Sequence, residues 1–154
     1  MSSSAYCSLI DDFCDLVMLP KQPAFYELAS VLVRNVEINL AHHNGEGKGE
    51  VLIYCVFGPL AHDREQEMQR MLEINFYLFS GPYSPSLSYN PESERAVLTS
   101  YAVVEALTAQ QLLALLSKLA NLALAWQEGA FLGAAPPASV KGRTAASSFT
   151  KVSL

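Results

Sequence analysis

Charged residues are scarce in this chain of 154 amino acids. They make up 16% of the sequence, while apolar residues make up 51%, and a typical soluble domain has about 25% charged residues. So little charge is typical of a domain that buries part of its surface against another chain. The length allows one domain, and the composition indicates that this domain belongs to an obligate oligomer.

Basic residues are the scarcer of the two signs, with 10 Lys and Arg against 15 Asp and Glu. Lys141, Arg143 and Lys151 all lie in residues 133–154, which contain no acid, so residues 1–132 carry a net charge of −8. An acidic body repels nucleic acids and anionic membranes. We therefore expect no nucleic-acid partner and no membrane partner, whereas a basic protein partner agrees with the charge.

Cysteine pairs and targeting segments are also missing. Cys7, Cys14 and Cys55 are odd in number and form no CxxC motif, which fits reduced thiols in a cytoplasm. The first residues lack the basic segment of a secretory signal. The apolar stretch at 108–132 is interrupted by polar residues too often for a membrane span. These features predict a cytoplasmic protein.

No pattern of catalytic or metal-binding residues is evident. His42 and His43 are adjacent, so on a strand they face opposite sides, and we expect them in solvent at a hairpin end rather than on a metal with His62. Cys55 lies in an apolar run, where its thiol is expected to be protonated and inert. We therefore predict that the protein is not an enzyme and binds no cofactor and no metal. A hydrolase that uses His62 and Asp63 is the weakest of the alternatives.

Hydrophobic periodicity alternates between helix and strand along the chain. The order of helix, two or three strands, helix, two strands and helix predicts an α+β domain with an antiparallel twisted sheet and helices packed on it. Residues 1–132 form one domain in this interpretation, and residues 133–154, rich in Ala, Ser, Pro and Thr, are an expected disordered tail. The expected elements are a helix at 4–18, a strand region at 27–42 with a bulge or break near Arg34, a strand at 51–57 covered on both faces, a helix at 63–79, a hairpin of 86–89 and 95–104, and a helix at 108–131.

The first predicted helix has an apolar stripe and an acidic face. Asp11, Asp12 and Asp15 occupy the acidic face, where charges are expected to be solvated rather than to bind metal. The apolar stripe and the alternating apolar residues at 36–40 fit either a core or the wall of a binding groove, and the pattern leaves both open. These candidate binding residues are Leu9, Phe13, Leu16, Val36, Ile38 and Leu40.

The middle helix has too many apolar faces for the surface of a monomer. From Met71 to Phe79 the apolar residues point around the whole cylinder, interrupted only by Glu73 and Asn75, whereas a surface helix shows one apolar face. We expect this half-helix to pack on its own sheet and against a second copy across a two-fold axis. The predicted dimer interface consists of Leu72, Phe76, Phe79, Leu98 and Tyr101.

Three segments together point to a known family. They read LIDDFCDLVMLP at 9–20, MLEINFYLFSGPYSPSLSYNPESERAVLTSY at 71–101 and LTAQQLLALLSKLANLALAW at 107–126. Leu72 and Asn75 match a Leu-x-x-Asn core, Gly81 leads into a strand pair, and Trp126 lies near the end of the last helix. In this order the segments resemble the class I type III secretion chaperones, the Tir-chaperone (CesT-like) family. The family's two short strands are not evident at 20–41.

The resemblance implies an acidic homodimer in the bacterial cytoplasm. Such a dimer holds the N-terminal segment of one or more secreted effectors in extended form, without ATP or a cofactor of its own, and the ATPase of the secretion apparatus is a compatible further partner. A sheet edge at the 36–40 strand or its neighbour, together with apolar grooves, would bind such a segment. The alternative is a non-enzymatic regulatory or structural α+β dimer that binds a folded partner or a small ligand.

Overall fold

The computed structural model describes residues 4–44, 49–60, 63–81 and 84–129. The predicted tail at 133–154 and His62 lie outside them. The described part is an α+β domain, as expected, with helices and antiparallel strands in the predicted order. Its elements are α1 (Ser4–Val17), η1 (Pro23–Tyr26), β1 (Leu28–Val33), β2 (Val36–Asn44), β3 (Gly49–Pro59), α2 (Arg64–Leu78), β4 (Ser86–Asn90), β5 (Arg95–Val103), η2 (Val104–Ala106) and α3 (Ala109–Gln127).

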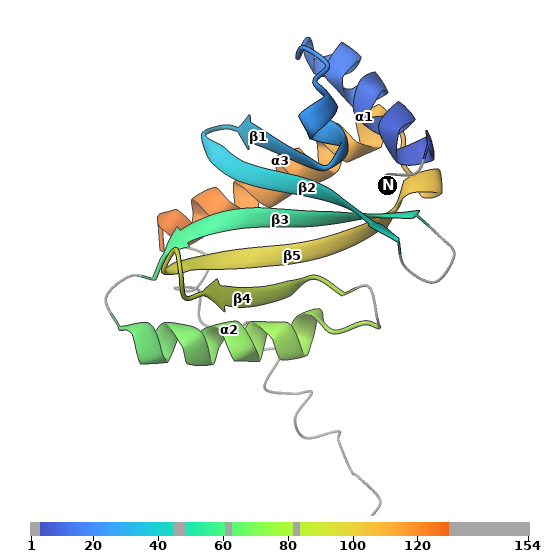
Figure 1. Cartoon of the computed structure of the whole chain (residues 1–154). Coiled ribbons are helices and arrows are strands. Elements are labelled where there is room, and N and C mark those ends of the chain that lie inside the picture. The colour runs from blue at the N-terminus through green and yellow to red at the C-terminus, as the bar shows by residue number, and fades with distance from the viewer. Residues whose placement is uncertain (1–3, 45–48, 61–62, 82–83, 130–154) are drawn as a thin grey trace, which may run out of the picture.

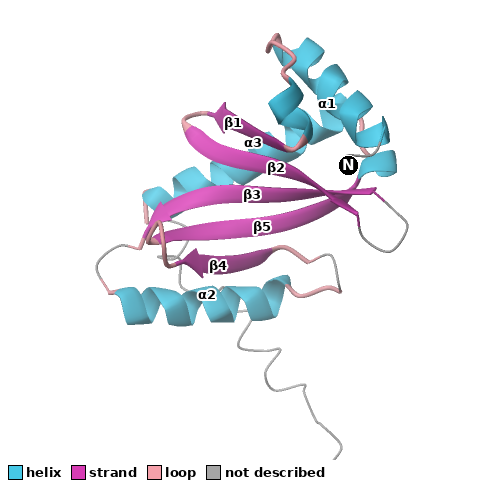
Figure 2. Ribbon diagram, viewed as in Figure 1, coloured by secondary structure: helices cyan, strands magenta, loops and turns pink. Residues whose placement is uncertain are grey.

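The described strands form one antiparallel sheet in the order β1-β2-β3-β5-β4. Helices α1 and α3 lie on one face of this sheet, and α2 runs alongside β4 at its edge (Figures 1 and 2). The other face carries no helix in these views. The helices of the described residues are therefore distributed over one face and one edge of the sheet, and none of them covers the second face.

A two-residue turn separates β1 from β2. Arg34 and Asn35 have φ angles of 52° and 64°, and Val33 pairs with Val36 across them. Two consecutive positive φ angles are the geometry of a tight hairpin turn whose twist matches that of the strands. The expected break near Arg34 is thus confirmed as a turn, and the two short strands that the sequence did not reveal at 20–41 are present.

The core lies between the sheet and the helices α1 and α3. Alternate residues of β3 point into it, because side chains of a strand alternate between the two faces. The core-facing set is Val51, Ile53, Cys55 and Phe57, all fully buried, and the opposite set is Leu52, Tyr54 and Val56, all half-buried. Among the described residues no helix packs on the second face, so the prediction that 51–57 is covered on both faces is wrong for this part of the single chain.

Local signals define both ends of α3. The Thr108 hydroxyl accepts a hydrogen bond from the Gln111 N–H at 3.2 Å, and the Gln111 side chain accepts one from the Thr108 N–H at 2.9 Å. This reciprocal capping box starts the helix, as the sequence predicts. Gly129 has a φ of 76° and donates its N–H to the Trp126 carbonyl at 2.9 Å, so the helix ends earlier than the predicted 131. No described helix is long and apolar enough to cross a membrane.

Candidate partner-binding surfaces

The outer edge of β4 is closed by a side chain of α2. The Asn75 Nδ2 donates a hydrogen bond to the Leu87 carbonyl at 2.8 Å, and the Leu87 N–H donates one to the Asn75 Oδ1 at 2.7 Å. The side-chain amide thereby supplies the donor and the acceptor that a neighbouring strand would supply. The main-chain N–H and carbonyl of Leu87 are therefore already hydrogen-bonded and cannot pair with another strand.

The opposite edge of the sheet, β1, has a strand neighbour on one side only. Among the described residues, only β2 pairs with β1. Leu28 and Leu32 are exposed on the open face, with Leu32 at 74% exposure, and β1 contains no Lys or Pro to discourage pairing. The strand of Val36, Ile38 and Leu40 is β2, which is paired on both sides. The predicted edge of the sheet was the 36–40 strand or its neighbour. The structure shows that the neighbour, β1, is the edge strand.

Most of the predicted binding residues face the core of the single chain. Only Leu16, at 39% exposure, keeps substantial surface. The other five are buried because the stripe of α1 and the inward positions of β2 pack against α3 and one another. These buried residues are Leu9, Phe13, Val36, Ile38 and Leu40. Of these five, Leu9 also lines the groove that is described next, whereas the other four shape the core beneath the binding surfaces.

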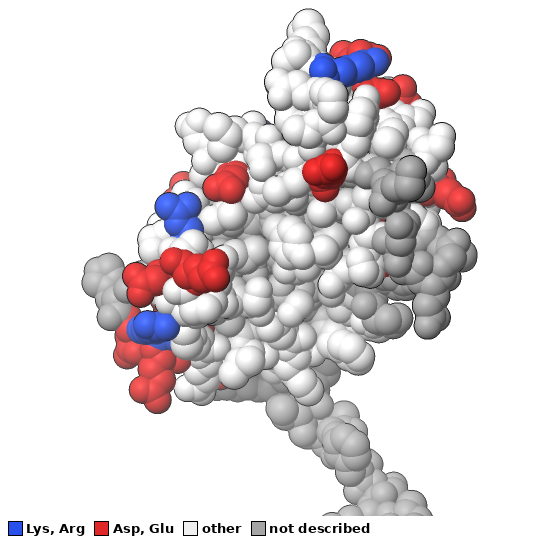
Figure 3. All heavy atoms as spheres, in the orientation of Figure 1, with Lys and Arg blue, Asp and Glu red and all other residues white. Residues whose placement is uncertain are grey.

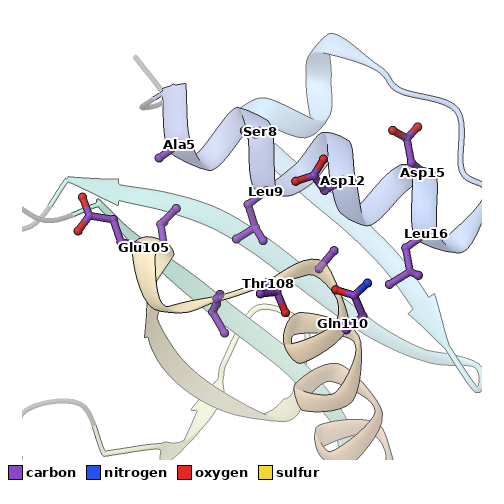
Figure 4. Close-up of a pocket in the computed structure, with 12 residues that line it drawn as sticks. Ala5, Ser8, Leu9, Asp12, Asp15, Leu16, Glu105, Thr108 and Gln110 are labelled. Atoms are coloured by element: carbon purple, nitrogen blue, oxygen red, sulfur yellow. The ribbon is translucent and has the colours of Figure 1, made fainter.

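A groove of about 780 Å³ lies between α1 and the segment that joins β5 to α3. In Figure 4, Leu9 and Leu16 point from α1 toward the start of α3, and Thr108 and Gln110 lie across from them. The volume is within the range of about 300–1,000 Å³ that is usual for ligand pockets. A groove wall at Leu9 and Leu16 was one of the two options that the sequence left open, but the opposite wall was not predictable, because it comes from a distant part of the chain.

Helix α2 exposes the apolar residues that the sequence assigned to a dimer interface. Leu72, Phe76 and Phe79 are all exposed, with Phe76 at 75%, and Met71 alone in this helix is buried. Leu98 is 3% exposed and belongs to the core, whereas Tyr101, three residues later on β5, is half-buried on the opposite face of the strand. Leu98 therefore adds no side-chain surface to this patch.

Charged residues are sparse over the open face of the sheet. Figure 3 shows Lys, Arg, Asp and Glu gathered mainly near its margins, with a broad uncharged area over β3, β5 and β4. A second hollow of about 390 Å³ lies on this face; Leu28, Tyr54, Val56 and Val97 are among its lining residues, together with the charged Glu37 and Arg95. Contiguous uncharged surface of this kind is typical of a face that contacts another polypeptide.

Several titratable residues have contacts within the described part of the chain. Burial raises the pKa of the Cys55 thiol to about 12, which agrees with the expectation of an inert thiol. The predicted solvent position of His42 is wrong, because its Nε2 is buried without a hydrogen bond and its ring lies 5.1 Å from that of Tyr6. Asp11 accepts a hydrogen bond from the Tyr26 hydroxyl at 2.8 Å. The described residues contain no group of metal ligands.

An open sheet edge, an apolar exposed helix and a groove beside α1 together define a polypeptide-binding α+β domain. The sequence profile of the Tir chaperone protein (CesT) family matches residues 14–127, and the chain belongs to this family. It is a type III secretion chaperone, a class of protein without enzymatic activity. The resemblance noted from the sequence is thus confirmed. No curated protein matches the chain significantly.

Solved structures share the fold at low sequence identity. A chain of the crystal structure of the ExsC–ExsE complex is 18% identical with a TM-score of 0.67, covering 83% of this chain and 96% of its own. A chain of the HopA1–SchA chaperone–effector complex is 16% identical with a TM-score of 0.61, and the match covers 80% of this chain and 94% of that one. A chain of the ExoT–SpcS complex from Pseudomonas aeruginosa is 20% identical with a TM-score of 0.51, and the match covers 82% of this chain and 97% of that one. At these identities the likeness establishes the fold alone.

Proposed function

We propose that this chain holds the N-terminal segment of a secreted effector in extended form and keeps it competent for secretion. The observation that carries the proposal is the open edge of β1, with exposed Leu28 and Leu32 beside it. An extended segment that joins a sheet edge gains main-chain hydrogen bonds whatever its sequence, and side-chain hollows then select among segments. The names of the similar structures, which are complexes with partner proteins, support the proposal.

The β1 edge also defines what the effector segment should look like. Leu28 and Leu32 face the open side of the sheet, while Ala29 and Val31 are buried toward the helices. A strand added beside β1 alternates in the same way. Its apolar residues should therefore recur at every second position, with one set seated near the hollow that Leu28 lines.

We propose further that the working form is a homodimer in the cytoplasm. Exposed Leu72, Phe76 and Phe79 form one apolar patch along α2, and the half-buried outer residues of β3 lie on a face without a helix. A two-fold axis would place this patch against itself and remove it from water. The proposed partners are thus secreted effectors, a second copy of the chain, and the ATPase of the secretion apparatus.

Co-purification from bacteria that carry a candidate effector tests the proposal. The full-length chain should retain a non-globular N-terminal segment of a large protein, at two chaperone chains per effector chain. Limited proteolysis of the complex should leave that segment protected and release the rest of the effector. Retention of a folded partner with no protected extended segment would instead support the alternative, a regulatory or structural α+β dimer.

A further inference from the structure

The groove beside α1 is acidic on its rim and apolar on its floor. Asp12, Asp15 and Glu105 are among its lining residues, and no Lys or Arg is. Asp15 pairs with Lys21 at 2.8 Å, whereas Asp12 and Glu105 make no ion pair with any residue of the described chain. Both residues of the Lys21–Asp15 pair are largely exposed, so the pair is weak. The rim thus presents negative charge that a basic ligand would neutralise.

The spacing on α1 suits a ligand with two positive charges. Asp12 and Asp15 are three residues apart on a helix, so they project from neighbouring positions on one side. Leu9 and Leu16 extend from the same helix toward the start of α3 (Figure 4). A short extended segment with basic residues at alternate positions would place both charges along the rim, with its backbone over Leu16.

The chain itself contains a segment of this chemistry. Residues 133–154 carry Lys141, Arg143 and Lys151 and no acid. Lys141 and Arg143 are two residues apart, so they share one side of an extended segment, and Val140 precedes them. Because the body is acidic and this stretch is purely basic, the two attract each other across one chain.

The linking residues are long enough for the contact. The groove lies at the N-terminal end of α3, and the chain leaves α3 at the other end, beyond Gln127. The 19 residues of α3 extend for about 28 Å at 1.5 Å per residue. Eleven residues lie between Gly129 and Lys141, and this stretch spans up to about 40 Å when extended. A tether of this kind also raises the effective concentration of the segment to roughly millimolar.

We propose that residues 140–143 bind in the groove between α1 and η2 of their own chain, with Lys141 and Arg143 along the rim at Asp12 and Asp15. The contact fills the groove with a segment of the chaperone and shields Leu16 from water. It goes beyond the binding of an effector at β1 and does not depend on it. Any other polypeptide that enters this groove must first displace the basic segment.

Carbodiimide cross-linking of the full-length chain tests the contact, because the reagent couples a lysine amine only to a carboxylate that touches it. Peptide mass spectrometry should find Lys141 joined chiefly to Asp12 or Asp15. The yield should fall in 1 M salt, where the screening length shrinks to about 3 Å. Arg143→Glu should lower the yield roughly tenfold, since it replaces an attraction by a repulsion while leaving both coupled residues in place.

Two controls make the result decisive. Lys151→Glu carries the same charge change outside the proposed segment and should leave the yield unaltered. A mixture of isotopically light and heavy chains separates contacts within a chain from contacts between chains. Three results would each overturn the proposal: coupling of Lys141 spread equally over remote acids such as Glu92 and Glu94, coupling found only between chains, or an Arg143→Glu yield equal to that of the unmodified chain.

Discussion

The side chain of Asn75 and the main chain of Leu87 are joined by two hydrogen bonds, one in each direction, of 2.8 and 2.7 Å. They attach α2 to the edge of the sheet, so that the apolar patch of α2 is held in a fixed position beside β4. They also occupy the Leu87 groups that a foreign strand would need. The two edges of the sheet thus differ: α2 covers β4 at Leu87, whereas no described strand pairs with the outer side of β1.

Replacing Asn75 by Asp removes the Nδ2 donor and places a carboxylate against the Leu87 carbonyl. The two hydrogen bonds are half-buried, and the loss of one such bond costs about 0.5–1.5 kcal/mol, so the free energy of unfolding in urea should fall by that amount. Asn121→Asp is the matched control, because Asn121 uses only its Oδ1, as the acceptor for Arg34 at 2.6 Å. Equal stability of the two variants would show that Asn75 does not hold α2 to the sheet.

Replacing Phe76 by Asp should break the proposed dimer. Phe76 is largely exposed in the single chain, so the change leaves the fold intact, but burying a carboxylate in an apolar interface is unfavourable. Loss of one aromatic anchor typically costs about 2 kcal/mol or more in binding. Light scattering should show a monomer or an aggregate. Met18→Asp, at another exposed apolar residue, should stay dimeric, and a soluble Phe76→Asp dimer would refute the interface.

His42 should make the fold less stable in acid. Burial, the positive N-terminus and His43 lower its pKa below the ordinary value of 6.5. The unfolded chain therefore binds the proton more readily, so stability is complete above pH 6.5 and declines as the pH falls through the lower folded pKa. His42→Phe keeps a ring beside Tyr6 but cannot be protonated. Urea titrations at pH 7.5 and 5.5 should show a smaller loss for the variant; an equal loss would exclude His42 as the cause.

Cys55 should resist thiol reagents in the folded protein. Its side chain is fully buried, and burial raises its pKa to about 12, so almost no thiolate exists at pH 8. Mass spectrometry after iodoacetamide treatment should find Cys55 unmodified until urea unfolds the chain. Cys7 is partly exposed and serves as the internal control. Modification of Cys55 at the rate of Cys7 in native buffer would contradict its place in the core.

Elements with local signals were predictable from the sequence. Asp63 accepts a hydrogen bond from the Gln66 N–H at 3.1 Å, and Thr108 and Gln111 cap α3, because capping depends on residues three apart. The change of parity near Arg34 is also a local signal, and it predicted a bulge or break there, although it did not distinguish the tight turn between two separate strands that the structure shows. The family could also be recognised, since the spacing from Leu72 to Asn75 and Gly81 reflects the attachment of α2 to β4.

Features that depend on tertiary arrangement were not predictable. The same alternation of apolar residues is expected for a strand of the core and for a strand that binds a partner. Only the order of the strands in the sheet shows that Val36, Ile38 and Leu40 lie in the core. The grouping of Leu98 with Tyr101 is a different case, because their odd spacing on one strand already puts them on opposite faces, and the sequence alone was enough to separate them. The stripe of α1 allowed a groove wall at Leu9 and Leu16, but the position of the groove was not predictable, because it depends on where α1 meets the start of α3.

The central claim is that the effector segment joins the edge of β1, and its affinity for edge variants tests this most directly. Leu28→Lys with Leu32→Lys places two charges beside the edge, whereas Glu92→Gln with Glu94→Gln makes the same change in net charge at the β4–β5 turn. Isothermal titration with the N-terminal segment of the co-purified effector should show at least about tenfold weaker binding for the first pair, a loss of about 1.4 kcal/mol, and little change for the second. Equal affinity of both double variants and the unmodified chain would contradict binding at β1.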